Sequence, residues 1–239
     1  MFFTVKLRRL KRLPAVLLFI AVLIALGIAA ENILRPAPVR GAASEPSLVI
    51  DPGHGGRDGG AVSMGGDKES GINLSIGLRL QKLAELYGTK TVMTRDADNG
   101  ADTSGEAYSE HRELVARTDI ANSVPNAVLI SIHQNFYPTS GPRGAQVLYA
   151  DGEGSETLGS LAHNNMVRFL DPDNRRVAAP APRSLYITSH VSCPAILVEC
   201  GFMSNFSELE KLLSEDYQMS IAMVLLVSYL QYSSGMALT

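Results

Sequence analysis

SLVIDPGHGG (Ser47–Gly56) decides the fold of this chain, because an apolar strand ends there in a glycine-rich polar loop. The first five residues form a β-branched run typical of a buried strand, and the Pro-Gly pair that follows ends it. Ala127–Ile132 (AVLISI) and Ala195–Cys200 (AILVEC) are also expected strands; the first is apolar in character almost throughout, and the second begins with the apolar run Ala195–Val198. Such runs are expected of strands that helices cover on both faces of a sheet.

The segments between these strands have helical periodicity. Apolar residues recur at helical spacing from Glu69 to Tyr87, and Gly88 is placed to end that helix. Alternating strands and amphipathic helices predict an α/β fold, a single layered domain with a mostly parallel twisted sheet of about six strands and helices on both faces. The other expected strands are Thr89–Thr94, Ala145–Ala150 and Leu185–Thr188, and the other expected helices are Glu110–Asn122, Ser155–Leu170, Ser207–Leu213 and Asp216–Tyr232.

The N-terminal part differs in composition from the rest. Residues 1–12 carry five cations and no acid, and residues 13–30 carry no charge. This pattern predicts a basic cytoplasmic tail, then one membrane segment that sends the following domain out of the cytoplasm. We expect an uncleaved anchor, with a cleaved signal peptide as the alternative. Residues 31–46, rich in Pro and Ala, are expected to be a linker, and residues 47–239 the catalytic domain.

Composition excludes several classes of protein. The chain has 239 residues, of which 46% are hydrophobic and 19% charged, so it is neither disordered nor a coiled coil. From Ser44 onward it has 14 lysines and arginines against 23 acidic residues. A net charge of −9 repels phosphate backbones, so no nucleic-acid partner is expected. Two cysteines are too few for a disulfide scaffold.

Four polar residues stand where a site is expected. In α/β sheets, sites form beyond the carboxyl ends of the strands. His54 follows the first strand, His133 and Glu199 end two later ones, and Glu69 opens a helix. Each histidine alone is more often a loop residue, and Glu69 alone could simply favour the helix dipole. Glu199 is harder to dismiss, since it follows an apolar strand where an unpaired carboxylate is costly.

Together these residues match a catalytic zinc site. Two histidines and one carboxylate are a common ligand set that leaves the fourth position open for water, whose pKa zinc lowers to about 7. A second carboxylate, not a ligand, is then needed to transfer the proton. We therefore assign His54, Glu69 and His133 to Zn²⁺ and Glu199 to proton transfer. The compact HExxH sequence is absent, which disfavours the metallopeptidases that carry it.

Four motifs carry a resemblance to a known family. They are Val49–Val62 (VIDPGHGGRDGGAV), the Lys68-Glu69 pair that opens a helix, Ser131–Asn135 (SIHQN) and Leu197–Asn205 (LVECGFMSN). In this order they resemble the zinc-dependent N-acetylmuramoyl-L-alanine amidases of the third amidase family. The resemblance implies cleavage of the amide between N-acetylmuramic acid and L-alanine of peptidoglycan. It also implies the zinc ligands and the catalytic glutamate assigned above.

A narrower resemblance concerns Arg95–Arg117, which is longer than in typical lytic members. With the single N-terminal membrane segment, it resembles the germination-specific amidases of the spore cortex. That resemblance implies removal of stem peptides before muramic-δ-lactam forms. Because the chain has no wall-binding module and an acidic body, an activating helper protein is a further expected partner.

Two alternatives remain open at this stage. One is a zinc peptidase on the same scaffold, which would act on peptide alone. The other is a membrane-tethered, non-catalytic wall-binding or regulatory protein, which the presence of all four site residues disfavours. The cysteines are both expected to be free, because a strand between Cys193 and Cys200 holds them farther apart than the roughly 7 Å limit for a disulfide.

Overall fold

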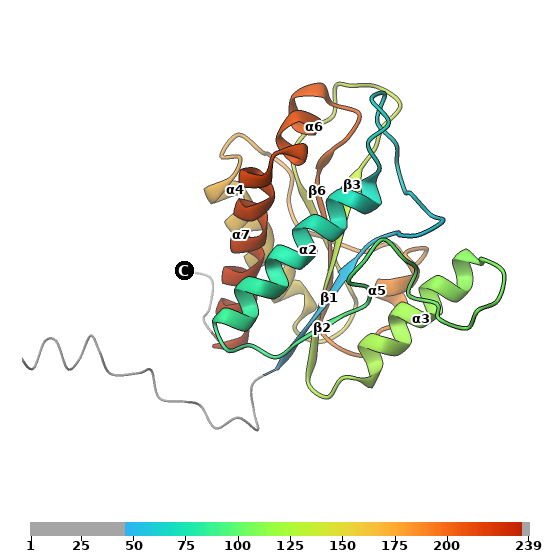
Figure 1. Cartoon of the computed structure of the whole chain (residues 1–239). Helices are drawn as coiled ribbons and strands as arrows, with labels where there is room; N and C mark the ends of the chain where they lie inside the picture. The colour runs from blue at the N-terminus through green and yellow to red at the C-terminus, as the bar shows by residue number, and fades with distance from the viewer. Residues whose placement is uncertain (1–45, 236–239) are drawn as a thin grey trace, which may run out of the picture. The chain divides into compact units, whose positions relative to one another are not determined.

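A six-stranded sheet forms the centre of residues 46–235, the part of the chain that this computed structural model describes (Figure 1). In the sheet the strands follow the order β2-β1-β3-β6-β4-β5; β4 runs antiparallel to β6, and the other neighbouring pairs are parallel. This confirms the expected mostly parallel sheet. The strands are β1 (Ser47–Pro52), β2 (Thr91–Met93), β3 (Ala127–Asn135), β4 (Gln146–Tyr149), β5 (Ala179–Pro180) and β6 (Ala195–Phe202).

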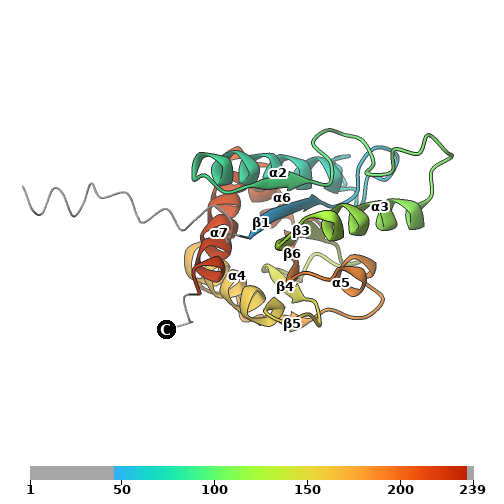
Figure 2. The same cartoon turned by 90° about the horizontal axis from the view of Figure 1, so that it is seen from below.

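Helices cover both faces of the sheet, as the sequence predicts. Figure 2 shows α2, α4 and α7 on one face and α3 and α5 on the other. Helix α6 contacts both α7 and β6. The helices are α2 (Glu69–Leu86), α3 (Glu110–Ser123), α4 (Ser155–Phe169), α5 (Tyr186–His190), α6 (Phe206–Leu213) and α7 (Glu215–Ser233).

The central strands carry runs of consecutive apolar residues because each face of the sheet packs into a separate core. In β3, Ile130 and Ile132 belong to the larger core beneath α2, α4 and α7. Leu129, the residue before Ile130, belongs to the smaller core on the side of α3 and α5. All three side chains are fully buried. Burying a side chain of this size stabilises the fold by roughly 1.5–3 kcal/mol.

One predicted strand is wrong. Leu185–Thr188 was expected to be a strand, but Tyr186–His190 form the short helix α5. The Thr188 hydroxyl donates to the Leu185 carbonyl at 3.0 Å, and the Ser189 amide donates to the same carbonyl at 3.2 Å, so local bonds replace a sheet ladder. A four-residue apolar run does not distinguish a strand from a buried helix by periodicity. The sixth strand is instead β5, a strand of two residues that was not predicted from the sequence.

The expected tail, membrane segment and nearly all of the linker lie outside the described residues. Among residues 46–235, no helix combines the length and the apolar character that a membrane span requires.

The sheet order places three strand ends side by side. Strand β3 lies between β1 and β6 and is parallel to both. Asp51 of β1 pairs with Ser131, and Glu199 of β6 pairs with His133, two residues farther along β3. Because parallel strands end at the same edge, the polar residues of all three motifs meet there.

Candidate metal centre

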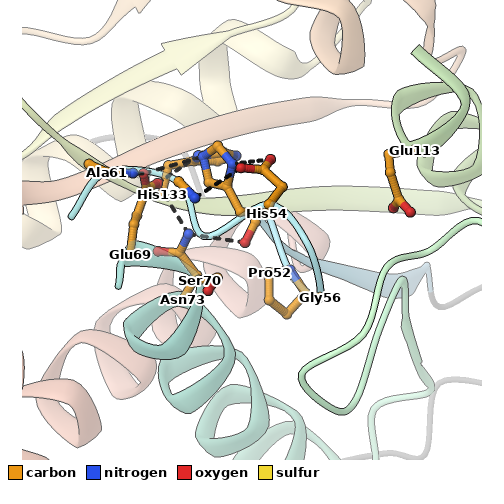
Figure 3. A network of polar contacts seen from close by, with 12 residues as sticks. Pro52, His54, Gly56, Ala61, Glu69, Ser70, Asn73, Glu113 and His133 are labelled. Atoms are coloured by element: carbon orange, nitrogen blue, oxygen red, sulfur yellow. Dashed lines mark hydrogen bonds and ion pairs between the residues drawn. The ribbon is translucent and has the colours of Figure 1, made fainter. Parts of the chain in front are cut away.

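The three predicted ligands converge at this edge of the sheet. Glu69 lies between the two histidines: its Oε2 is 3.2 Å from His54 Nε2, and its Oε1 is 3.0 Å from His133 Nδ1. One candidate ligand atom from each residue lies within 4.8 Å of the other two. Figure 3 shows the three side chains pointing toward one another from the loop after β1, the start of α2 and the end of β3. The residues that the structure describes contain no other such group of three or more.

Two glycines make this close approach possible. A Cβ atom on Gly53 would lie 2.2 Å from Cε1 and Nε2 of His133. A Cβ on Gly60 would lie 2.6 Å from Oε2 of Glu69, and Gly60 has a φ of +65°, in the left-handed region that favours glycine. Glycine is therefore needed at positions 53 and 60 because the candidate ligand side chains pass directly over the backbone there.

Glu69 is held as an ionised carboxylate. It is buried at the start of α2, where its Oε2 accepts from the Ala61 amide and its Oε1 accepts from the Gln134 amide, both at 3.0 Å. Burial alone would raise the pKa of Glu69, but hydrogen bonds and charges from His133 and His54 outweigh burial and hold the pKa far below its usual range. A carboxylate that stays charged at neutral pH suits a metal ligand.

Asp58 fixes the orientation of His54, a role that sequence reasoning missed. Its Oδ2 lies 2.6 Å from Nδ1 of His54, and its Oδ1 accepts from the Gly60 amide at 2.9 Å. Such a carboxylate leaves the other ring nitrogen free for a metal and fixes the imidazole tautomer. Asp58 stands inside the quoted first motif, four residues after His54, but its role depends on a loop conformation that spacing does not predict.

Glu199 lies beside the three ligands without joining them. It is the β6 residue paired with His133, and its Oε2 is buried with no hydrogen-bond partner among the described residues. Burial raises the pKa of Glu199; the charge of Glu69 adds to this effect, and the charges of His133 and His54 oppose it. A carboxylate with an unpaired buried oxygen next to a metal site is suited to take up a proton.

Helices α3 and α5 provide the opposite wall of the site. A cavity of about 70 Å³ is lined by the histidines and, across from them, by Glu110, Leu114 and Ile187. Glu113 of α3 also lines it and stands apart from the ligand cluster in Figure 3. The donor set fits a zinc ion, because two imidazoles and one ionised carboxylate are within reach of one ion and three ligands leave a position open.

Comparison with known proteins identifies the family. Residues 48–227 match the family model described as N-acetylmuramoyl-L-alanine amidase. The chain belongs to this family. The match lies within residues 47–239, and the prediction of an N-acetylmuramoyl-L-alanine amidase is confirmed.

Alignments with relatives cover most of the length of this amidase. It is 31% identical to the germination-specific N-acetylmuramoyl-L-alanine amidase of Bacillus subtilis, over 77% of this chain and 78% of the relative. The CwlD amidase of Clostridioides difficile, solved in complex with the GerS lipoprotein, is 30% identical; the alignment covers 80% of this chain and 99% of that one, with a TM-score of 0.75. AmiC2 of Nostoc punctiforme is 33% identical over 78% of this chain and 96% of its own, with a TM-score of 0.68.

Proposed function

We propose that this amidase uses zinc, held by His54, Glu69 and His133, to hydrolyse the amide between N-acetylmuramic acid and L-alanine of peptidoglycan stem peptides. The observation that carries the proposal is the cluster of three ligand atoms within 4.8 Å of one another, beside a carboxylate oxygen that lacks a partner. Glu199 is the proton-transfer residue.

The residues of this chain divide the work of the reaction. When bound, zinc would polarise the scissile carbonyl and acidify a water molecule. Glu199 takes a proton from the attacking water, whose oxygen forms a bond to the muramic acid carbonyl carbon. Glu199 then delivers this proton to the alanine nitrogen, so that the C–N bond breaks and leaves a carboxylate on muramic acid and a free amine on alanine. Asp58 keeps His54 oriented while Glu69 stays ionised between the two histidines. The chain thus supplies both the metal ligands and the group that moves the proton.

Muropeptide analysis with and without chelator tests this function. The purified full-length protein should release intact stem peptides with a free L-alanine amine from peptidoglycan, detected by mass spectrometry. Release should stop after chelation and return with zinc. Products cut within the stem peptide would favour the zinc peptidase instead. Binding to peptidoglycan without any product would favour a non-catalytic wall protein.

We also propose a role in the spore cortex. The germination-specific relative in Bacillus subtilis supports this role, as does the length of the Arg95–Arg117 stretch. In a spore-forming host that lacks its own such amidase, this chain should restore muramic-δ-lactam to the cortex, and Glu199→Gln should not. Failure of the active protein to restore the lactam would assign the enzyme to the vegetative wall.

We further propose that residues 13–30 anchor the enzyme to the outer side of the cytoplasmic membrane and that a helper protein assists it there. The structure of the Clostridioides difficile relative in complex with a lipoprotein supports a helper. Fractionation of cells with peptide mapping tests the anchor: residues 1–12 should be recovered from the mature, membrane-bound protein. Their absence from a protein found in the medium would indicate cleavage.

A further inference from the structure

Two buried arginines lie beneath the candidate metal centre and take no part in the function proposed above. Arg95 follows β2 and is 3% exposed, and Arg117 lies on α3 and is 4% exposed. They stand at the two ends of the long stretch that sequence analysis singled out. A buried arginine is costly unless its donors are satisfied, so the partners of both side chains indicate what they hold in place.

Arg117 binds the backbone that leads into His54. Its Nη1 donates to Oδ1 of Asp51 at 2.7 Å and to the Pro52 carbonyl at 2.8 Å. Its Nη2 donates to the carbonyl of His54 itself at 2.5 Å. Thr94 and Ser131 complete the environment of the Asp51 carboxylate, each donating a hydroxyl at 2.6 Å. One guanidinium therefore joins α3, the end of β1 and the ligand residue.

Arg95 binds the same loop and the start of α2. Its Nε donates to the Pro52 carbonyl at 2.8 Å. Its Nη2 donates to the Gly53 carbonyl at 2.9 Å and to the Ser70 carbonyl at 2.8 Å. Ser70 follows Glu69 directly, so this side chain fixes the distance between the loop that carries one ligand and the helix that carries another.

These contacts hold a strained part of the backbone in place. His54 has a φ of +60°, a left-handed conformation that is unfavourable for a residue other than glycine. Such a conformation persists only where the surroundings impose it. The carbonyls of Pro52, Gly53 and His54 are each held by at least one guanidinium, and charge-assisted bonds of this kind are about twice as strong as neutral ones.

We propose that Arg117 and Arg95 are positioning residues that set the affinity and geometry of the metal centre by holding the main chain of residues 52–54. The inference rests on the proposed role of His54 as a metal ligand. The simpler reading, an ion pair that only stabilises the fold through Asp51, predicts that metal binding is unaffected once the buried charge is removed.

The test separates metal binding from folding. Arg117→Met leaves the buried Asp51 without its cation, so the informative variant is the double substitution Asp51→Asn with Arg117→Met, compared with Asp51→Asn alone. Zinc affinity is measured by competition with a chromophoric chelator, coordination geometry by the absorption spectrum of the Co²⁺-loaded protein, and folding by the melting temperature. Arg112→Met is the matched control, since Arg112 lies on the same helix but pairs with Asp102.

We expect the double variant to bind zinc about 10–100-fold more weakly than Asp51→Asn, the usual effect of losing a group that orients a ligand. The Co²⁺ spectrum of the double variant should change as well. Arg117→Lys in place of Arg117→Met should restore part of the zinc affinity. The control Arg112→Met should bind zinc as tightly as the parent. Arg95→Met, which leaves the ion pair of Arg117 intact, should weaken zinc binding similarly, and it decides the question if the double variant does not fold.

A folded double variant that binds zinc within threefold of Asp51→Asn, with an unchanged Co²⁺ spectrum, would overturn the inference. His54→Ala in the parent distinguishes this failure from failure of the proposed function. If His54→Ala abolishes zinc binding while the arginine variants do not, only the positioning role is wrong. If His54→Ala binds zinc normally, the proposed metal site itself is wrong, and the positioning role fails with it.

Discussion

Glu199 differs from the other acids of the site because one of its oxygens is buried without a partner. Glu199→Gln keeps the shape of the side chain but removes its ability to accept a proton. We expect the variant to bind zinc like the parent and to lose at least 10²-fold in kcat, because general acid–base groups contribute about 10²–10⁴ in rate. Turnover of purified muropeptides and metal analysis of the same sample provide the two measurements.

The contrast with a ligand variant makes this prediction specific. His133→Ala should lose zinc and activity together, since one of three ligands is removed. If Glu199→Gln instead lost its zinc, Glu199 would be a ligand rather than the proton-transfer group. Turnover close to that of the parent would remove Glu199 from the mechanism altogether.

Gly53 offers a purely steric test of the site. Its φ lies outside the left-handed region, so alanine is excluded only by the His133 ring, 2.2 Å from the added Cβ. Gly53→Ala should displace His133 and reduce zinc binding by at least tenfold, measured by chelator competition. Gly71→Ala is the control, because it meets nothing within 4 Å and lies in α2, where alanine stabilises a helix by up to about 1 kcal/mol. Equal zinc affinity in both variants would contradict the packing described here.

At the scale of single residues, the sequence predicted which polar residues meet at the edge of the sheet better than which residues hold them in place. His54, Glu69, His133 and Glu199 follow from strand ends and a helix start, because parallel strands bring such ends together. Asp58 could not be assigned, since its bond to His54 depends on how the glycine-rich loop turns. Arg95 and Arg117 are the two ends of a stretch that the sequence singled out. The carbonyls that they bind could not be predicted, because the folded loop determines them.

At the scale of elements, long apolar runs predicted strands reliably and short ones did not. Strands β3 and β6 are buried on both faces, so each begins with four consecutive apolar residues, Ala127–Ile130 and Ala195–Val198. Strand β5 has two residues, one of them proline, and carries no recognisable pattern. Helix α5 buries its apolar side chain in the core that a strand at this place would also fill, since Ile187 packs with Leu129 and Leu197. Burial alone therefore could not decide between helix and strand there.

The position of strand β6 leads to a prediction about the two cysteines. It occupies most of the sequence between half-buried Cys193 and buried Cys200, so the thiols cannot form a disulfide across it. Burial raises the pKa of both thiols, and the charge of Glu199 raises that of Cys200 further. Iodoacetamide should modify native Cys193 slowly and leave Cys200 unmodified, whereas the denatured protein should take two labels without reductant. Intact-mass spectrometry counts the labels; a requirement for reductant would contradict the extended strand.

At the scale of the whole domain, the candidate metal centre brings together segments that are far apart in sequence. Its three candidate ligands come from the loop after β1, the start of α2 and the end of β3, so a bound ion would link the helical layer that contains α2 to the sheet. An ion that binds only the folded protein stabilises it by about 2.7 kcal/mol when its free concentration is 100 times Kd. Chelation is therefore expected to lower the melting temperature of the entire domain.

Without metal, the same residues form an ion network whose stability depends on pH. Burial alone would lower the pKa of His54, but hydrogen bonds and charges from Glu69 and Asp58 outweigh burial and raise it to about 9. A histidine with a raised folded-state pKa stabilises the fold fully below its ordinary value of 6.5, and this contribution is lost as pH rises through about 9. A metal needs the neutral imidazole, so zinc affinity should rise over the same range.

The melting temperatures of zinc-loaded and chelator-treated protein are therefore expected to diverge between pH 6.5 and pH 9, the interval that the shift of His54 defines. Calorimetry at fixed free zinc measures the gap. Asp58→Asn is the matched control, because removing one group that raises the pKa of His54 should make the gap change less with pH. A gap that stays constant or narrows as pH rises would mean that His54 does not exchange a proton for the metal, and the ligand would have to be sought elsewhere in the site.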